Sequence, residues 1–114
     1  MLNLEKIYKA RERIKDVVVD TPFSYAPYLS EISECDVYLK KENLQVTGAF
    51  KIRGAYNKIA SLTDAQRDCG VIAASAGNHA QGVALSASKF KIKAVIVMPE
   101  STPLTKVNGV KHFG

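Results

Sequence analysis

The chain has 114 residues, 46% of them hydrophobic and 24% charged, which is typical of one folded domain and excludes collagen-like and disordered sequences. Lys and Arg outnumber Asp and Glu by 16 to 11, and the net charge of +5 permits attraction to anions without choosing among them. No apolar run approaches the roughly 20 residues of a membrane helix, so we expect a cytoplasmic protein without a membrane partner.

Neither a metal site nor a nucleic-acid site is expected. Two cysteines and two histidines stand at no metal-ligand spacing, so we expect no metal, and we interpret Cys35 and Cys69 as reduced thiols. Basic residues near the N-terminus alternate with acidic ones, as on a solvated face. No nucleic-acid recognition motif accompanies them, so no nucleic-acid partner is predicted.

The first 40 residues predict one helix and one strand. Apolar residues at helical spacing after Asn3, a candidate N-cap, predict an amphipathic helix that ends before Val17. Pro22 breaks this pattern, and residues 20–33 predict a loop with at most one short helix. Residues 37–40 alternate apolar and polar side chains and predict a short strand with one exposed face.

Helices and apolar strands alternate in the rest of the chain. A turn at 47–49 precedes a helix from Phe50 to near Leu62, and Thr63 with Gln66 has the spacing of a capping box that begins a short helix. The runs 71–74 and 94–98 predict strands covered on both faces, and residues 79–89 predict the helix between them. The fold class is therefore α/β, with a parallel βαβ unit at residues 71–98.

The last predicted element is a helix that begins with Thr102 as N-cap and Pro103 as its first residue. Asn108 and Gly109 form a turn signal, so we expect this helix to end or fray there. Two parallel strands leave open sheet edges, which indicates a chain that is part of something longer or needs a partner.

Two positions have the surroundings that chemistry requires. Residues 75–79 join a buried strand to a helix, where free backbone N–H groups favour an anion. The pattern by itself favours the alternative, in which Ser75 or Asn78 is a plain helix cap. Lys51 begins a helix, where burial and the positive helix end would favour a neutral, nucleophilic amine. The alternative is a solvated surface lysine, no different from Lys58.

Two long motifs carry a resemblance to a known family. Residues 41–55, KENLQVTGAFKIRGA, resemble the lysine segment of the threonine and serine dehydratases, which use pyridoxal phosphate and have the tryptophan-synthase-β-like fold. Residues 75–82, SAGNHAQG, resemble that family's asparagine loop, and residues 97–107 match a third segment. The resemblance implies part of a three-layer parallel-sheet fold (fold type II), incomplete relative to the family, with residues 1–114 as the N-terminal portion of the catalytic domain.

The resemblance also implies a role for each site residue. Lys51 would hold pyridoxal 5'-phosphate as a Schiff base and move the proton at the substrate Cα. Phe50 would pack beside the cofactor ring, and Asn78 would hydrogen-bond the ring 3-oxygen. The loop that receives the substrate carboxylate would consist of Ser75, Ala76, Gly77, Asn78 and His79.

The implied activity is β-elimination and deamination of L-threonine, or alternatively of L-serine, to 2-oxobutanoate or pyruvate and ammonia, in isoleucine biosynthesis or in degradation. The implied assembly is a homo-oligomer. Related serine racemases carry a second serine where this chain has Ala76, which favours dehydration, although a racemase or another β-elimination enzyme stays an alternative. The family's glycine-rich phosphate cradle is not found among these residues, so a non-catalytic fragment is the alternative from another class.

Overall fold

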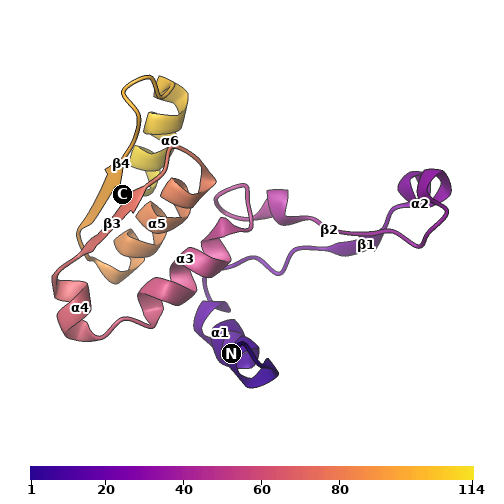
Figure 1. Ribbon diagram of the computed structural model, residues 1–114, viewed down its shortest axis with the longest axis horizontal. Coiled ribbons are helices and arrows are strands. Elements are labelled where there is room, and N and C mark those ends of the chain that lie inside the picture. Colours follow the sequence, from indigo (N-terminus) through magenta and orange to yellow (C-terminus); the bar gives the residue numbers. More distant parts are fainter.

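The computed structural model describes residues 1–114 (Figure 1). The elements in chain order are α1 (Leu4–Ile14), β1 (Phe23–Tyr25), α2 (Pro27–Ser33), β2 (Tyr38–Lys40), the 3-10 helix η1 (Glu42–Leu44), α3 (Lys51–Ala60), α4 (Asp64–Asp68), β3 (Val71–Ala74), α5 (Asn78–Phe90), β4 (Ala94–Val97) and α6 (Leu104–Phe113). The radius of gyration is 16.5 Å, whereas a compact domain of this length would have about 13 Å. No helix is long and apolar enough to cross a membrane.

Helix α1 begins where its cap residue predicts. The Asn3 side chain accepts a hydrogen bond from the Lys6 backbone N–H at 3.0 Å, and this satisfies one of the free donors of the first turn. Ile14 is the one buried residue of α1, and the helix contacts α3. The predicted helix is therefore confirmed.

Strands β1 and β2 form an antiparallel ribbon that carries α2 at its tip and projects from the rest of the molecule (Figure 1). The predicted loop over 20–33 is therefore wrong in part, because it contains β1 as well as α2. The predicted strand is also exposed on both faces rather than one, since nothing covers the ribbon. Aromatic contacts lie along the ribbon, where the rings of Phe23 and Tyr25 are each 5.4 Å from the ring of Tyr38.

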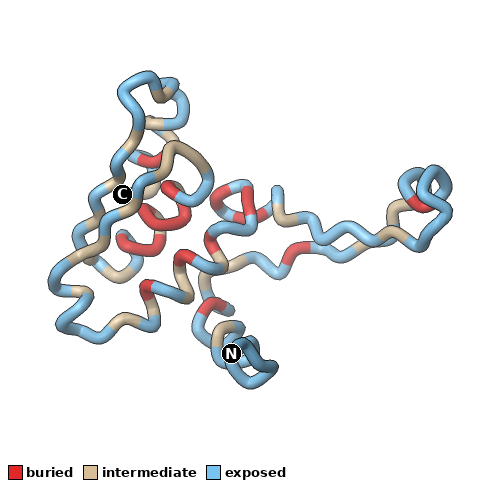
Figure 2. The backbone as a smooth tube through the Cα atoms, in the orientation of Figure 1, coloured by how far each residue is buried: buried red, intermediate tan, exposed pale blue.

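The βαβ unit at residues 71–98 is confirmed, with β3 and β4 paired in parallel from Val71 opposite Ala94 to Ala74 opposite Val97. The core lies on one face of this sheet, where Val71, Ala73 and Ile96 pack against α3 and α5. Figure 2 shows the buried residues concentrated in these two helices. The other residues of this core, buried or packed against it, are Ala55, Ile59, Val83, Phe90 and Ile92.

The opposite face of the sheet is exposed, so the prediction of strands covered on both faces is wrong for these residues. Ile72 is 74% exposed and Val97 is 50% exposed. The physical reason is that α3, α5 and α6 all pack against the face that Ile96 shares, which leaves the alternate residues of both strands without a partner.

The sequence predicted how α4 and α6 begin, and the structure confirms the first of these predictions. Thr63 and Gln66 form the predicted capping box, with reciprocal hydrogen bonds of 3.0 and 3.3 Å, and α4 follows. Helix α6 begins at Leu104, one residue later than predicted, and its side-chain cap is missing because Thr102 does not bond to it. The helix also continues through Asn108 to Phe113, since Val110 is buried against Ala80 and Ala84 of α5 and this packing outweighs the turn signal.

Candidate active site

Lys51 is the first residue of α3, directly after the N-cap Phe50, as the sequence predicts. Its Nζ takes part in no hydrogen bond or ion pair within the chain and lies 5.2 Å from the centre of the Phe50 ring. The expectation that Lys51 is buried is wrong. Its side chain is exposed, whereas Ile52, the next residue around the helix, is fully buried. The structure thus presents a primary amine without a counter-ion at the head of a helix.

A cavity of about 660 Å³ runs along α3, β3 and the start of α5, and it contains the Lys51 side chain. Phe50 and His79, both site residues by the sequence argument, line the same cavity. Lys51 and Lys58 add basic groups to its wall, and no Asp or Glu side chain lines it. Arg53 lines it too, but its charge is paired with Glu42. The cavity therefore suits an anionic ligand.

Residues 75–79 connect the end of β3 to the beginning of α5. Gly77 is the N-cap, and no side chain caps the helix, so Ser75 and Asn78 do not have the plain capping role that the sequence left open. The Ser75 hydroxyl instead accepts a hydrogen bond from the Gly77 N–H at 3.3 Å. The N–H groups of Asn78, His79 and Ala80 donate to no acceptor of the chain, and such free donors at a helix N-terminus bind anions.

The structure brings only some of the predicted site residues together. Phe50, Lys51 and His79 share the cavity, whereas Ser75, Ala76, Gly77 and Asn78 lie at the adjoining turn and do not line it. Asn78 and His79 are exposed, and residues 75–77 are half-buried. Lys51 and the turn therefore lie at the N-terminal ends of α3 and α5, two helices that pack against each other.

Gly82 was not predicted as a site residue, but it sets how closely α5 approaches Lys51. A Cβ atom at Gly82 would lie 3.4 Å from the Lys51 carbonyl carbon, 3.4 Å from the Ile52 nitrogen and 3.3 Å from the Ala55 Cβ. The glycine thus lets α5 pack directly on the peptide bond that follows Lys51. The sequence did contain a signal for this role, because a glycine inside a helix costs about 1 kcal/mol relative to alanine and therefore indicates a close contact.

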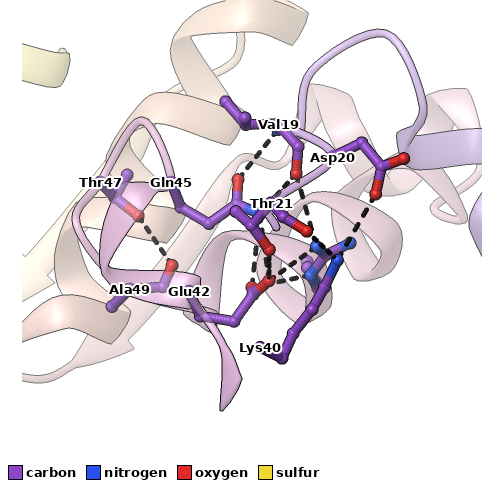
Figure 3. Close-up of polar contacts among 9 residues, drawn as sticks. Val19, Asp20, Thr21, Lys40, Glu42, Gln45, Thr47 and Ala49 are labelled. Carbon is purple, nitrogen blue, oxygen red and sulfur yellow. Dashed lines mark hydrogen bonds and ion pairs between the residues drawn. The ribbon is translucent and has the colours of Figure 1, made fainter. Parts of the chain in front are cut away.

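A polar network that the sequence argument also missed lies next to the Lys51 turn (Figure 3). Glu42 accepts two hydrogen bonds of 2.8 Å from the Arg53 guanidinium and one of 2.6 Å from the Thr21 hydroxyl. Mainly because of the Arg53 bonds, the pKa of Glu42 falls to about 2, and the carboxylate in turn raises the pKa of Arg53. The network joins residues up to 34 positions apart, Val19 and Arg53, so no local pattern reveals it.

The donor set fits an aldehyde cofactor that carries a phosphate. Such a group needs an amine that is not held in an ion pair, an apolar ring surface and hydrogen-bond donors for anionic oxygens. Lys51 and Phe50 supply the first two features, and the free N–H groups at the start of α5 supply donors for one anionic group, while the glycine-rich phosphate cradle is not found among these residues. The basic lining of the cavity adds a favourable potential for the negative charge.

The fold and the site define a class of protein. Residues 14–114 match the family described as pyridoxal-phosphate dependent enzyme, and the chain belongs to that family. The cofactor class implied by the resemblance is therefore confirmed at the family level.

Two curated relatives are similar to the chain over nearly all of its length. L-threonine ammonia-lyase of Thermotoga maritima is 54% identical over 114 residues, which are 100% of this chain and 28% of that protein. L-threonine dehydratase biosynthetic IlvA of Staphylococcus saprophyticus is 54% identical over 108 residues, 95% of this chain and 26% of that protein. The chain thus spans about a quarter of the length of these relatives.

Solved structures agree on the fold. Maize serine racemase superposes with a TM-score of 0.91 at 40% identity, covering 98% of this chain and 34% of that one. The processed form of threonine deaminase isoform 2 from Solanum lycopersicum gives a TM-score of 0.82 at 38% identity, covering 99% and 32%. The predicted fold class, part of the α/β fold of pyridoxal-phosphate enzymes (fold type II), is confirmed.

Proposed function

We propose that the protein catalyses the β-elimination and deamination of L-threonine to 2-oxobutanoate and ammonia, and that residues 1–114 form the N-terminal portion of its catalytic domain. The observation that carries this proposal is the unpaired Lys51 amine in a basic cavity shared with Phe50 and His79. The 54% identity to an L-threonine ammonia-lyase over the whole chain supports threonine as the substrate.

Lys51 has two tasks in this proposal. Its Nζ, which no carboxylate holds, would hold the cofactor through the aldehyde group, and as a free amine it would accept the proton from the substrate Cα. Bound pyridoxal phosphate supplies an electron sink for the carbanion left at Cα. Phe50 would pack beside the cofactor ring, and the Asn78 amide would hydrogen-bond its 3-oxygen.

Residues 75–79 hold the substrate by its carboxylate. The free N–H groups of Asn78 and His79 and the positive end of α5 bind the anion and turn the Cα–H bond toward Lys51. Ala76 has no group that accepts a proton from the other side of Cα. This favours elimination over racemisation: the β-hydroxyl leaves as water with the proton that Lys51 took from Cα. Hydrolysis of the released enamine then gives the keto acid and ammonia.

The remaining expectations are part of the same proposal. L-serine is a second substrate that would give pyruvate, and the names of the relatives support threonine as the preferred one. We also propose a homo-oligomer in the cytoplasm with small amino acids as its ligands and without a nucleic-acid or membrane partner. The name "biosynthetic" of the staphylococcal relative supports a role in isoleucine biosynthesis.

The test is keto-acid release by the purified protein with added pyridoxal phosphate. We expect turnover of L-threonine above that of L-serine, no D-serine, and loss of activity in Lys51→Ala. Lys89→Ala, which removes an exposed lysine from the last turn of α5, is the matched control and should retain activity. D-serine as the main product would replace the proposal by racemisation, and Lys51→Ala with full activity would reject it.

A non-catalytic role makes a different prediction in a second experiment. After incubation with pyridoxal phosphate, borohydride reduction and peptide mapping show which lysine carries the cofactor. Selective labelling of Lys51 is the expected result. Labelling spread over many of the chain's lysines, with no keto acid formed, would favour the fragment alternative.

A further inference from the structure

The loop between η1 and α3, which leads directly into Lys51, is closed by its own hydrogen bonds. The Gly48 N–H donates to the Gln45 carbonyl at 2.8 Å, and the Thr47 hydroxyl donates to the Ala49 carbonyl at 3.3 Å. Gly48 has φ +65°, a conformation that favours glycine. Gln45 and Thr47 are only 4% and 5% exposed. Residues 45–50 therefore form a compact unit rather than a loose connection.

One ion pair joins the two ends of this loop. Glu42 precedes the loop, and Arg53 lies two residues after Lys51 in the first turn of α3. The guanidinium Nε and Nη2 each donate to a different oxygen of the Glu42 carboxylate, both at 2.8 Å. A bidentate pair of this kind fixes orientation as well as distance.

A third segment holds the pair in place (Figure 3). The Thr21 hydroxyl donates to the Glu42 Oε1 at 2.6 Å. The Gln45 amide bonds to both backbone groups of Val19, accepting from its N–H at 3.0 Å and donating to its carbonyl at 2.8 Å. The chain that leads from α1 into β1 thus braces both the ion pair and the loop.

These contacts fix the rotation of the first turn of α3. Successive residues point about 100° apart around a helix. Ile52 is fully buried, and Arg53 is held by Glu42, so two neighbouring side chains are set in different directions. Gly82 brings α5 within contact of the backbone at 51–52. The direction that stays free is the one in which Lys51 points.

We propose that Glu42 is a positioning residue for Lys51, which sets the lysine through the Arg53 ion pair and the loop between them. The inference rests on the proposed function, in which Lys51 binds the cofactor. Misplacement of a reacting group by about 1 Å can cost on the order of 100-fold in rate. The Glu42 carboxylate is held by Arg53, Thr21 and Gln45, and Glu42 does not line the cavity at Lys51.

The lowered pKa of Glu42 supports this role. With a value of about 2, the carboxylate stays ionised at every pH at which an amine such as that of Lys51 can act as a nucleophile. The Glu42 side chain is 17% exposed and that of Arg53 is 32% exposed, so water screens the pair less than it screens an open surface pair.

The test is Glu42→Gln in the purified protein, with borohydride trapping of pyridoxal phosphate and hydrogen exchange as readouts. We expect the share of label on Lys51 to fall about 10-fold or more, with labelling of the other lysines unchanged and faster exchange at residues 46–51. The matched control is Glu12→Gln, which makes the same charge change in an exposed pair with Lys15 and should alter neither readout.

A second variant keeps the test valid if Glu42→Gln does not fold. Arg53→Lys preserves the charge but loses the bidentate geometry, and we expect it to lower Lys51 labelling as well. Wild-type exchange rates at 46–51 in a folded Glu42→Gln variant, or undiminished labelling of Lys51, would overturn the inference. Failure of the wild-type protein to label Lys51 would refute the proposed function instead. The hydrogen-exchange measurement would then still test whether the Glu42–Arg53 pair holds residues 46–51.

Discussion

Gly82→Ala tests whether α5 approaches the Lys51 backbone as closely as the structure shows. The added Cβ would lie 3.4 Å from the Lys51 carbonyl carbon and from the Ile52 nitrogen. These two contacts have ordinary van der Waals length, but the Cβ would also lie 3.3 Å from the Ala55 Cβ, which is tighter than usual. Because the Cβ of Ala55 cannot rotate away, α3 and α5 should separate by a few tenths of an ångström. Gly54→Ala is the matched control, because a Cβ at that helical position meets nothing within 4 Å.

The expected magnitudes follow from two opposing effects. Alanine gains up to about 1 kcal/mol over glycine inside a helix. Overpacking in a close-packed contact costs about 1–3 kcal/mol. Gly54→Ala receives only the gain and should be stabilised by up to about 1 kcal/mol, whereas the net change for Gly82→Ala lies between zero and a loss of about 2 kcal/mol.

The assay is urea unfolding of both variants and the wild type, followed by circular dichroism, with trapping of pyridoxal phosphate on Lys51 as a second measurement. We expect the free energies of unfolding of the two variants to differ by about 1–3 kcal/mol. Labelling of Lys51 should fall in Gly82→Ala, since the turn that carries it has moved. Equal stabilisation by both substitutions would refute the close approach of α5 to α3.

Two further predictions concern stability. Glu42 has a pKa of about 2 in the folded protein against an ordinary value of 4.5. Its ionisation therefore stabilises the folded protein by up to about 3 kcal/mol above pH 4.5, and this stabilisation is lost as the pH falls toward 2. The free energies of unfolding of wild type and Glu42→Gln should consequently converge in acid. Parallel curves of unfolding free energy against pH would contradict this. Ile52→Ala should cost about 2–5 kcal/mol because Ile52 is fully buried, whereas Ile72→Ala, at a residue 74% exposed, should change the thermal midpoint little.

The parts of the fold that the sequence predicts are those with local causes. The Asn3 cap, the capping box at Thr63 and the βαβ unit each depend on residues close together in the chain. Strand β1 was missed because its pairing with β2 is not encoded in its own three residues. The continuation of α6 past Asn108 was missed because Val110 packs on α5, a contact between helices that periodicity does not report.

The same division applies to the site. Lys51 and residues 75–79 could be located because each lies at a helix start with a recognisable motif around it. The residues that position them could not be located from the sequence. Glu42 and Arg53 are 11 positions apart, and Gly82 contacts the backbone of a residue 31 positions away. The residues that carry the chemistry are thus visible in the sequence, while those that set the geometry appear only in the structure.

Two kinds of force therefore act on the same turn of α3. The Gly82 contact is short-range packing, which resists approach but gives little resistance to separation or rotation. The Glu42–Arg53 pair is directional, and it opposes the rotation that packing permits. Because both act on residues 51–53, losing one increases the dependence of Lys51 on the other. The effects of Gly82→Ala and Glu42→Gln on Lys51 labelling should consequently exceed the sum of the single changes when combined.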